Sequence, residues 1–183
     1  MEEQKYDERF LWQRNVRDCY RALSTEEIKA DLKAKALPCA VLMAQIEHDF
    51  NFGCLVRNAN AFGAEAVYYY GRRHWDRRAA QGTYRYTDVI HLPSIEAVSA
   101  LKERYAFVGL ENNINGTTPL QDFQWPEKPL LCFGEEKDGL QPEILALLDH
   151  LVEISMRGSV RSINVGAASA AALFAYSLKQ GRQ

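Results

Sequence analysis

The stretch ISMRGSVRSINV (residues 154–165) decides the fold class of this chain. An apolar run from Leu151 to Ile154 predicts a short strand, and an alanine-rich helix is expected from Asn164 to Gln180. Between them lies a short polar loop, in which Ser162 or Asn164 could cap the helix with a side-chain oxygen. This order of strand, loop and helix is typical of an α/β protein.

Upstream of this stretch, short apolar runs alternate with helical patterns. Strands are expected at residues 39–45, 66–70, 105–110 and 130–133. Helices are expected at 51–62, closed by Gly63, at 94–104, and from Pro142 onward. Because each strand is followed by a helix or a long connection, we expect a parallel sheet covered on both faces.

The first 37 residues have a different pattern. Helical spacing runs from Asp7 to Leu23, and the S-x-x-E sequence from Ser24 to Glu27 predicts a capping box that opens a second helix. That helix should continue to about Lys35 and end before Pro38. Two short helices cannot build a core of their own. We therefore expect an N-terminal helical extension (residues 1–37) in front of an α/β domain (residues 38–183).

Composition excludes several classes of protein. No apolar run approaches the roughly 20 residues that cross a bilayer, and the charged N-terminus has no signal-peptide pattern. These features predict a soluble cytoplasmic protein with no membrane partner. The four cysteines, Cys19, Cys39, Cys54 and Cys132, are scattered. Their spacing predicts no metal site, and we expect buried thiols in a reducing compartment.

The net charge of −2 argues against a uniformly basic nucleic-acid binder, but charge is concentrated locally. Between Arg72 and Arg85 the chain carries five arginines and one acid, interleaved with Trp75, Tyr84 and Tyr86. Such a stretch could hold phosphates and stack bases. A solvated arginine-rich loop is the alternative.

The common nucleotide-binding and hydrolase motifs are absent. The sequence contains no G-x-G pair, no G-x-x-x-x-G-K-[ST] loop and no G-x-S-x-G elbow. Three polar clusters instead follow predicted strands, at residues 51–63, 133–140 and 154–165. Ligands of parallel sheets collect at this end of the strands.

Each cluster also has a structural explanation when taken alone. Asn51 could cap a helix that carries Arg57 nearly two turns further along. The sequence FGEEKDGL (residues 133–140) could be an ordinary charged turn, or a tight loop in which backbone approaches a ligand.

Taken together and in this order, the clusters resemble the three motifs of the SpoU (TrmH-type) family of the SPOUT superfamily. The resemblance covers the chain from about Pro38 to its C-terminus. Ile163 stands where leucine is more usual, and Gly166 where serine is common. The matching residues are Asn51, Arg57 and 61–63 in the first motif, Gly134, Glu136, Gly139 and Leu140 in the second, and Ile154, Met156, Gly158, Ser162, Ile163, Asn164 and Val165 in the third.

The resemblance implies an α/β domain with a deep C-terminal trefoil knot, a homodimer, and methyl transfer from S-adenosylmethionine to a ribose 2′-hydroxyl of RNA. In such a dimer, first-motif residues of one subunit approach the cofactor of the other. The implied cofactor-binding residues are Leu110, Gly134, Ile154, Met156 and Ile163.

The implied catalytic residues are Asn51, Arg57, Glu136, Ser162 and Asn164. Arginine is a poor base because its pKa is above about 12. Arg57 is therefore expected to hold a substrate phosphate and stabilise the developing alkoxide. Asn51 and Asn164 would orient these groups, and Glu136 and Ser162 would complete the hydrogen-bond network.

The RNA substrate is less sharply predicted. The Arg161-Ser162-Ile163-Asn164 context and the short extension favour tRNA, with the D-loop guanosine as target. An rRNA 2′-O-methyltransferase and a tRNA wobble-position enzyme are alternatives of the same fold. A noncatalytic RNA-binding SPOUT protein and an unrelated α/β enzyme are alternatives from other classes.

Overall fold

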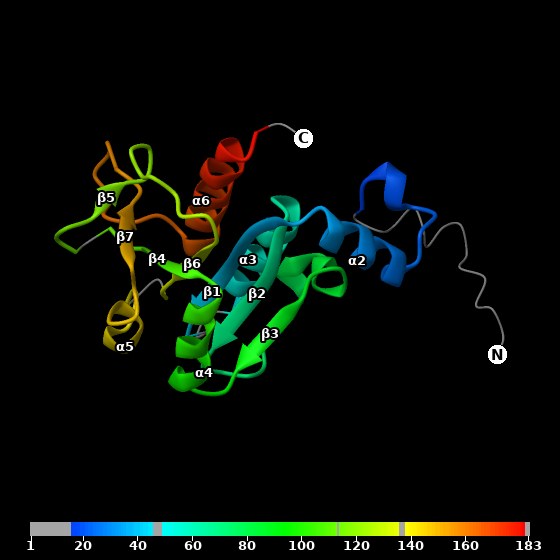
Figure 1. Cartoon of the computed structure of the whole chain (residues 1–183), viewed down its shortest axis with the longest axis horizontal. Helices are drawn as coiled ribbons and strands as arrows, with labels where there is room; N and C mark the ends of the chain where they lie inside the picture. Colours follow the sequence, from blue (N-terminus) through cyan, green and yellow to red (C-terminus); the bar gives the residue numbers. More distant parts are fainter. Residues whose placement is uncertain (1–15, 46–48, 113, 136–137, 182–183) are drawn as a thin grey trace.

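A sheet of parallel strands runs through the middle of the molecule (Figure 1). The computed structural model describes residues 16–45, 49–112, 114–135 and 138–181, and within them seven strands pair in the order β3-β2-β1-β6-β4-β7-β5. The expected parallel sheet is confirmed. The strands are β1 Leu37–Ala44, β2 Ala64–Tyr70, β3 Val89–Leu92, β4 Ala106–Leu110, β5 Thr118–Pro119, β6 Pro129–Phe133 and β7 His150–Glu153.

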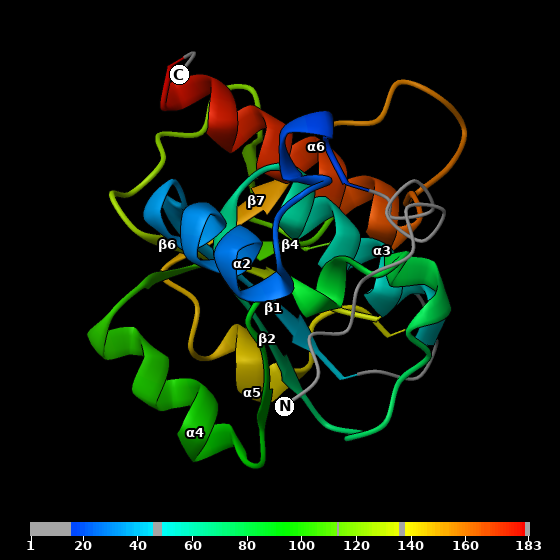
Figure 2. The same cartoon turned by 90° about the vertical axis from the view of Figure 1, so that its right-hand side faces the viewer.

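Helices cover both faces of this sheet, as expected (Figure 2). Along β1, Cys39, Val41 and Met43 pack into the core beneath α3 and α6. Ala40, Leu42 and Ala44 face the opposite core, which α4 and α5 cover. The strand is apolar throughout because both of its faces are buried. The helices are α2 Thr25–Ala34, α3 Asp49–Ala61, α4 Ile95–Ser99, α5 Pro142–Leu145 and α6 Val165–Lys179, with 3₁₀ turns at Asp18–Tyr20, Arg78–Ala80, Thr83–Arg85 and Ala100–Glu103.

The sequence analysis did not predict strands β3 and β5. β5 is two residues long and β3 four, which is too short for an apolar alternation to stand out. They exist because β2 and β7 each offer an open edge, with Val67 opposite Val89 and Val152 opposite Thr118.

The N-terminal region agrees with the sequence only in part. The capping box is confirmed, because the Glu27 amide donates to Ser24 Oγ at 3.2 Å and the Ser24 amide donates to Glu27 Oε2 at 2.8 Å. The helix expected from Asp7 to Leu23 is wrong over residues 16–23, and its earlier part lies outside the described residues. A single 3₁₀ turn replaces it, since Tyr20 packs against Ile28 and Tyr86. Pro38 lies inside β1 and does not end α2.

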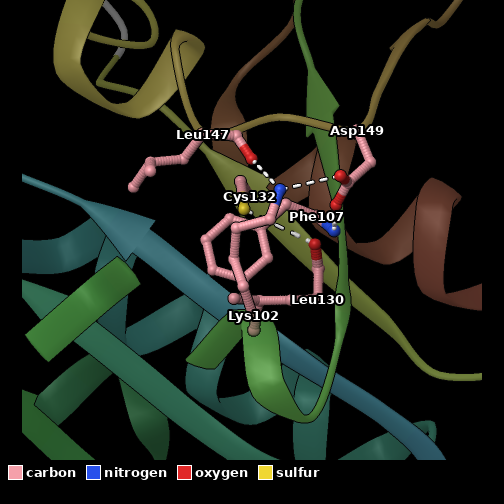
Figure 3. Close-up of polar contacts among 6 residues, drawn as sticks. All are labelled: Lys102, Phe107, Leu130, Cys132, Leu147 and Asp149. Carbon is pink, nitrogen blue, oxygen red and sulfur yellow. Dashed lines mark hydrogen bonds and ion pairs between the residues drawn. The ribbon is translucent and has the colours of Figure 1, made fainter. Parts of the chain in front are cut away.

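Side-chain hydrogen bonds join β4 and β7 at their amino ends (Figure 3). Asp149 Oδ2 accepts from the Phe107 amide at 2.8 Å, and Lys102 Nζ donates to Asp149 Oδ1 at 2.7 Å. Burial opposes ionisation of Asp149, but these hydrogen bonds outweigh it and lower its pKa. These bonds help to fix the register of β4 and β7 at the end of the sheet opposite to the cavity described below.

The cysteines are not uniformly buried. Cys39 and Cys132 lie in the core, where burial raises the pKa of both thiols, that of Cys39 to about 12. The prediction is wrong for Cys19, which is exposed, and for Cys54, which is half-buried on α3. Among the described residues, no cluster of three His, Cys, Asp or Glu side chains could hold a metal ion. None of their helices combines the length and the apolarity that a membrane crossing requires.

Candidate active site

A cavity of about 340 Å³ opens at the carboxyl ends of β4, β6 and β7. Its volume lies within the usual range of small-molecule sites, roughly 300 to 1,000 Å³. The start of α6 closes one side through Val165 and Ala168. The position follows from the sheet, because the carboxyl ends of parallel strands meet at one edge.

All five residues proposed from the sequence as cofactor ligands line this cavity. They come from three separate segments of the chain: the end of β4, the loop after β6, and the segment from β7 to α6. Ser162 lines the same cavity. The five are Leu110, Gly134, Ile154, Met156 and Ile163. Their contact with a cofactor stays a prediction.

The loop after β6 folds back on Gly134. The Glu135 amide donates to the Gly139 carbonyl at 3.2 Å, and the Gly139 amide donates to the Glu135 carbonyl at 2.9 Å. A Cβ atom on Gly134 would overlap the main chain of Gly139 and Leu140, and Gly139 has a φ of +66°. The expected tight loop is confirmed here, and the approach of its backbone to a ligand stays a prediction. Glu136, a predicted catalytic residue, lies outside the described residues.

Two polar residues that the sequence interpretation missed hold the cavity together. Asn112 Nδ2 donates to the Ile154 carbonyl at 2.7 Å, and Asn112 Oδ1 accepts from the Ile154 amide at 3.1 Å. Glu111 Oε2 accepts from the Leu140 amide at 3.1 Å. Both line the cavity. The available signal was their position directly after the buried strand that ends at Leu110, where ligand-facing side chains gather.

Replacing Asn112 with alanine should loosen the cavity. The change removes both hydrogen bonds that join the end of β4 to Ile154, and we expect unfolding free energy to fall by about 1–2 kcal/mol. Affinity for S-adenosylmethionine should fall as well, because Ile154 lines the cavity. Urea denaturation and calorimetry check both effects. Asn115→Ala is the matched control, since Asn115 is exposed on the same loop; equal behaviour of the two variants would contradict the role given to Asn112.

The two predicted asparagines meet where α3 packs on α6. Asn164 Nδ2 donates to Asn51 Oδ1 at 2.8 Å, and Asn164 Oδ1 caps α6 by accepting from the Gly166 amide at 2.9 Å. Asn58 adds a second link, donating to the Gly166 carbonyl at 2.7 Å. Asn164 is thus confirmed as an N-cap. Asn51 is not one, because α3 begins at Asp49 and the Asn51 side chain is used between the helices.

Arg57 lies elsewhere. Its side chain is exposed and lines a different surface hollow, together with Arg17 and Tyr20 of the N-terminal region and Phe62 of the turn after α3. It does not line the cavity that contains Gly134 and Ile163. Within a single chain, the predicted cofactor residues and Ser162 line one cavity, and the Asn51–Asn164 pair lies near it at the start of α6. Arg57 does not reach that cavity.

The lining of the cavity suits S-adenosylmethionine. Leu110, Phe133, Ile154 and Ile163 offer apolar surface for a planar base, and the Gly134 cradle leaves main chain close to the space. Three carboxylates, those of Glu111, Glu135 and Asp138, line the remainder. A cavity with acidic walls favours a cation such as a sulfonium.

Known proteins of the same architecture match this chain. The profile of the SpoU rRNA Methylase family matches residues 38–176. The tRNA (guanosine(18)-2′-O)-methyltransferase of Escherichia coli K12 is 29% identical over 147 residues, which cover 78% of this chain but only 63% of that relative.

Solved structures agree with the fold. The A. aeolicus TrmH/SpoU tRNA modifying enzyme superposes with a TM-score of 0.75 at 20% identity, covering 85% of this chain and 82% of that one. The SpoU methyltransferase AviRb from Streptomyces viridochromogenes, in complex with the cofactor AdoMet, superposes with a TM-score of 0.66 at 26% identity, covering 77% of this chain and 57% of that one.

The parallel sheet with a cavity at the ends of its strands is thus an α/β architecture that this chain shares with solved SpoU-type structures. Within that architecture, this chain belongs to the SpoU rRNA methylase family.

Proposed function

We propose that this protein transfers a methyl group from S-adenosylmethionine to a ribose 2′-hydroxyl of RNA. The observation that carries the proposal is the cavity at the ends of β4, β6 and β7, where five residues from three separate segments converge. The cofactor supplies an electrophilic methyl group. The protein must then hold the ribose oxygen in line with that group and favour its deprotonated form.

Different residues would bind the cofactor, position the helices and stabilise the reacting groups. Main chain around Gly134, Ile154 and Ile163 would hold the adenosine, with Leu110 and Met156 as apolar neighbours. Asn164 fixes the start of α6 and, through Asn51, its position against α3. Ser162, which lines the cavity, would hydrogen-bond the reacting groups together with Glu136. Arg57 would bind a substrate phosphate and stabilise the developing alkoxide, while that phosphate or a water would accept the proton of the 2′-hydroxyl.

A second copy of the chain would bring Arg57 to the cavity. The outer face of α6 carries Phe174, which is 53% exposed, and Leu178, which is 65% exposed. The ring of Phe62, directly after α3, lies 6.1 Å from that of Phe174. Since α3 carries Arg57 and α6 begins at the cavity, a twofold pair that buries this face would bring the two sites near each other. We infer a homodimer with shared active sites.

Charge on the outer face of α6 should break this dimer. Burying two like-charged carboxylates against an apolar surface is unfavourable, so the Phe174→Glu/Leu178→Glu variant should sediment as a monomer at micromolar concentration. Analytical ultracentrifugation measures the mass. The control is Ile90→Glu, which places the same charge on a 40% exposed apolar residue of β3. A dimeric double variant, or a monomeric wild-type protein, would exclude this interface.

The N-terminal residues 1–37 are proposed as an extension of a methyltransferase domain formed by residues 38–183. Tyr20 and Ile28 form a small cluster with Tyr86 that is separate from the two cores of the sheet. Lys29 Nζ lies 2.5 Å from Asp88 Oδ1 and adds an ion pair to that contact. The trefoil knot implied by the resemblance and the cytoplasmic location predicted from the composition stay predictions.

Transfer RNA is the proposed substrate, with the D-loop guanosine as the target. The name of the E. coli relative supports this choice. The test incubates the purified protein with labelled S-adenosylmethionine and either bulk tRNA or bulk rRNA, and then locates the product by nuclease digestion and mass spectrometry.

The outcomes of this experiment separate the candidates. Ribose methylation of a tRNA D-loop guanosine is the expected result. Methylation of a wobble nucleotide or of rRNA would keep the reaction and correct the substrate. Cofactor binding that is absent in calorimetry, together with no transfer to either pool, would favour a noncatalytic RNA-binding protein.

A further inference from the structure

The arginine-rich loop between β2 and β3 is packed against α3 (Figure 2). A Cβ atom on Gly53 would lie 2.6 Å from Ala79 Cβ, so the 3₁₀ turn at Arg78–Ala80 touches the helix backbone. The ring of Trp75 meets that of Phe52 edge-on at 4.8 Å. Thr83 Oγ1 donates to the Ala80 carbonyl at 2.7 Å and closes the second turn. The loop backbone is therefore packed against α3 and held by hydrogen bonds, so its side chains have defined positions.

The ring of Tyr84 contacts two of the arginines, Arg77 and Arg85. The guanidinium carbon of Arg77 lies 5.0 Å from the centre of the Tyr84 ring, and that of Arg85 lies 6.0 Å from it. Trp75 supports the same ring from its edge at 6.1 Å. A hydrogen bond with Arg85 lowers the pKa of the Tyr84 phenol, with burial opposing it. Both arginines are exposed, and a guanidinium held against an aromatic ring keeps N–H donors for phosphate oxygens.

Arg78 has a different role in the same loop. Its Nη2 lies 2.5 Å from Asp76 Oδ2, and its Nε donates to the same oxygen at 2.7 Å. Asp76 is the one acid between residues 72 and 85, against five arginines, so the segment carries a net charge of +4. Arg78 closes the turn with that acid, and the excess positive charge lies with the other arginines.

The loop also lies next to the motif residues. It packs on α3, the helix that supplies Asn51 to Asn164 at the start of α6 and that carries Arg57. A polyanion gripped by this loop would therefore run along the helix that presents first-motif residues. Phosphate contacts of this type fix the position of a nucleic acid without reading its sequence.

We propose that Arg77 and Arg85, held by Tyr84, form a phosphate clamp for the RNA backbone beside the target nucleotide. This inference rests on the proposed function and names the surface that positions its substrate. Bidentate arginine–phosphate pairs bind a nucleic-acid backbone strongly, and the ordered guanidiniums lose less freedom on binding than free side chains would.

Equilibrium binding of fluorescent bulk tRNA tests the clamp without requiring methyl transfer. The R77Q/R85Q variant should bind roughly 10- to 100-fold more weakly, and its plot of log Kd against log salt should be flatter by about 1.5–2 units. The R77K/R85K variant should regain most of the salt slope but not the full affinity, because lysine keeps the charge and loses the planar contact. Arg104→Gln is the control for loss of a surface guanidinium, since Arg104 pairs with Glu65 at 3.2 Å outside the loop.

Calorimetry with S-adenosylmethionine checks that each variant keeps its fold and its cofactor site. Wild-type affinity and salt slope in R77Q/R85Q would overturn the clamp, as would equal losses in the Arg104→Gln control. Failure of the proposed function looks different. A wild-type protein that binds neither bulk tRNA nor bulk rRNA would exclude the RNA substrate, and the clamp with it.

Discussion

Replacing Gly134 with alanine is expected to lower the affinity for S-adenosylmethionine by roughly 10- to 100-fold, because overpacking of a tight site costs about 1–3 kcal/mol. The added Cβ would overlap the main chain of Gly139 and Leu140, which cannot rotate away as a flexible side chain could. The loop that lines the cavity must move instead. Isothermal titration calorimetry measures the loss, and circular dichroism checks that the fold persists.

The chain contains a matched control for this change. Gly158 lies on the loop between β7 and α6, and a Cβ built there meets nothing within 4 Å. Gly158→Ala should therefore bind the cofactor like the wild-type protein. If Gly134→Ala also kept wild-type affinity, the cofactor would not be held by the loop after β6.

Replacing Arg57 with alanine should reduce the methyl-transfer rate by roughly 10²- to 10³-fold, as removal of one stabilising donor does elsewhere. Affinity for S-adenosylmethionine should stay unchanged, because Arg57 does not line the cavity of its own chain. Single-turnover kinetics at saturating RNA measure the rate. Near-wild-type turnover in a folded variant would remove Arg57 from the catalytic residues.

Mixed dimers test whether Arg57 acts on the partner's cavity. If active sites are shared, co-expressing Arg57→Ala chains with Gly134→Ala chains should restore about a quarter of wild-type activity, measured at a cofactor concentration too low to load the Gly134→Ala cavity, since half of the dimers then contain one intact site. Purified heterodimers of a wild-type chain with an Arg57→Ala/Gly134→Ala chain should be inactive. Sites contained within single chains would give the reverse pattern, with activity in these purified heterodimers and none in the mixture of the two single variants.

Several parts of the site could be predicted from the sequence because their chemistry is local. Asn164 caps α6 through amides two and three residues further along, and Ser24 and Glu27 cap α2 in the same way. Gly134 and Gly139 mark a tight loop because backbone contact within one turn requires them. The apolar runs of β1 and β6 predicted a buried parallel sheet.

Other expectations failed where a distant segment decides the structure. Asn51 could have capped its own helix, yet its oxygen accepts from Asn164, a residue more than a hundred positions away. The residues from Val16 to Leu23 have helical spacing, but burial of Tyr20 against Ile28 and Tyr86 leaves only a 3₁₀ turn. Asn112 has no distinguishing pattern, and it matters only because β7 lies beside β4.

By itself, then, the sequence determined the class of fold and the order of most of its strands and helices, because periodicity, capping and tight turns act over a few residues. The three motifs were identified from the sequence by their resemblance to those of the SpoU family. Only the tertiary structure decided which strand ends meet around the cavity, that Glu111 and Asn112 join them, and that Arg57 lies away from the cavity of its own chain. These features depend on the order of strands across the sheet, which is set by long-range burial and by hydrogen bonds between distant segments.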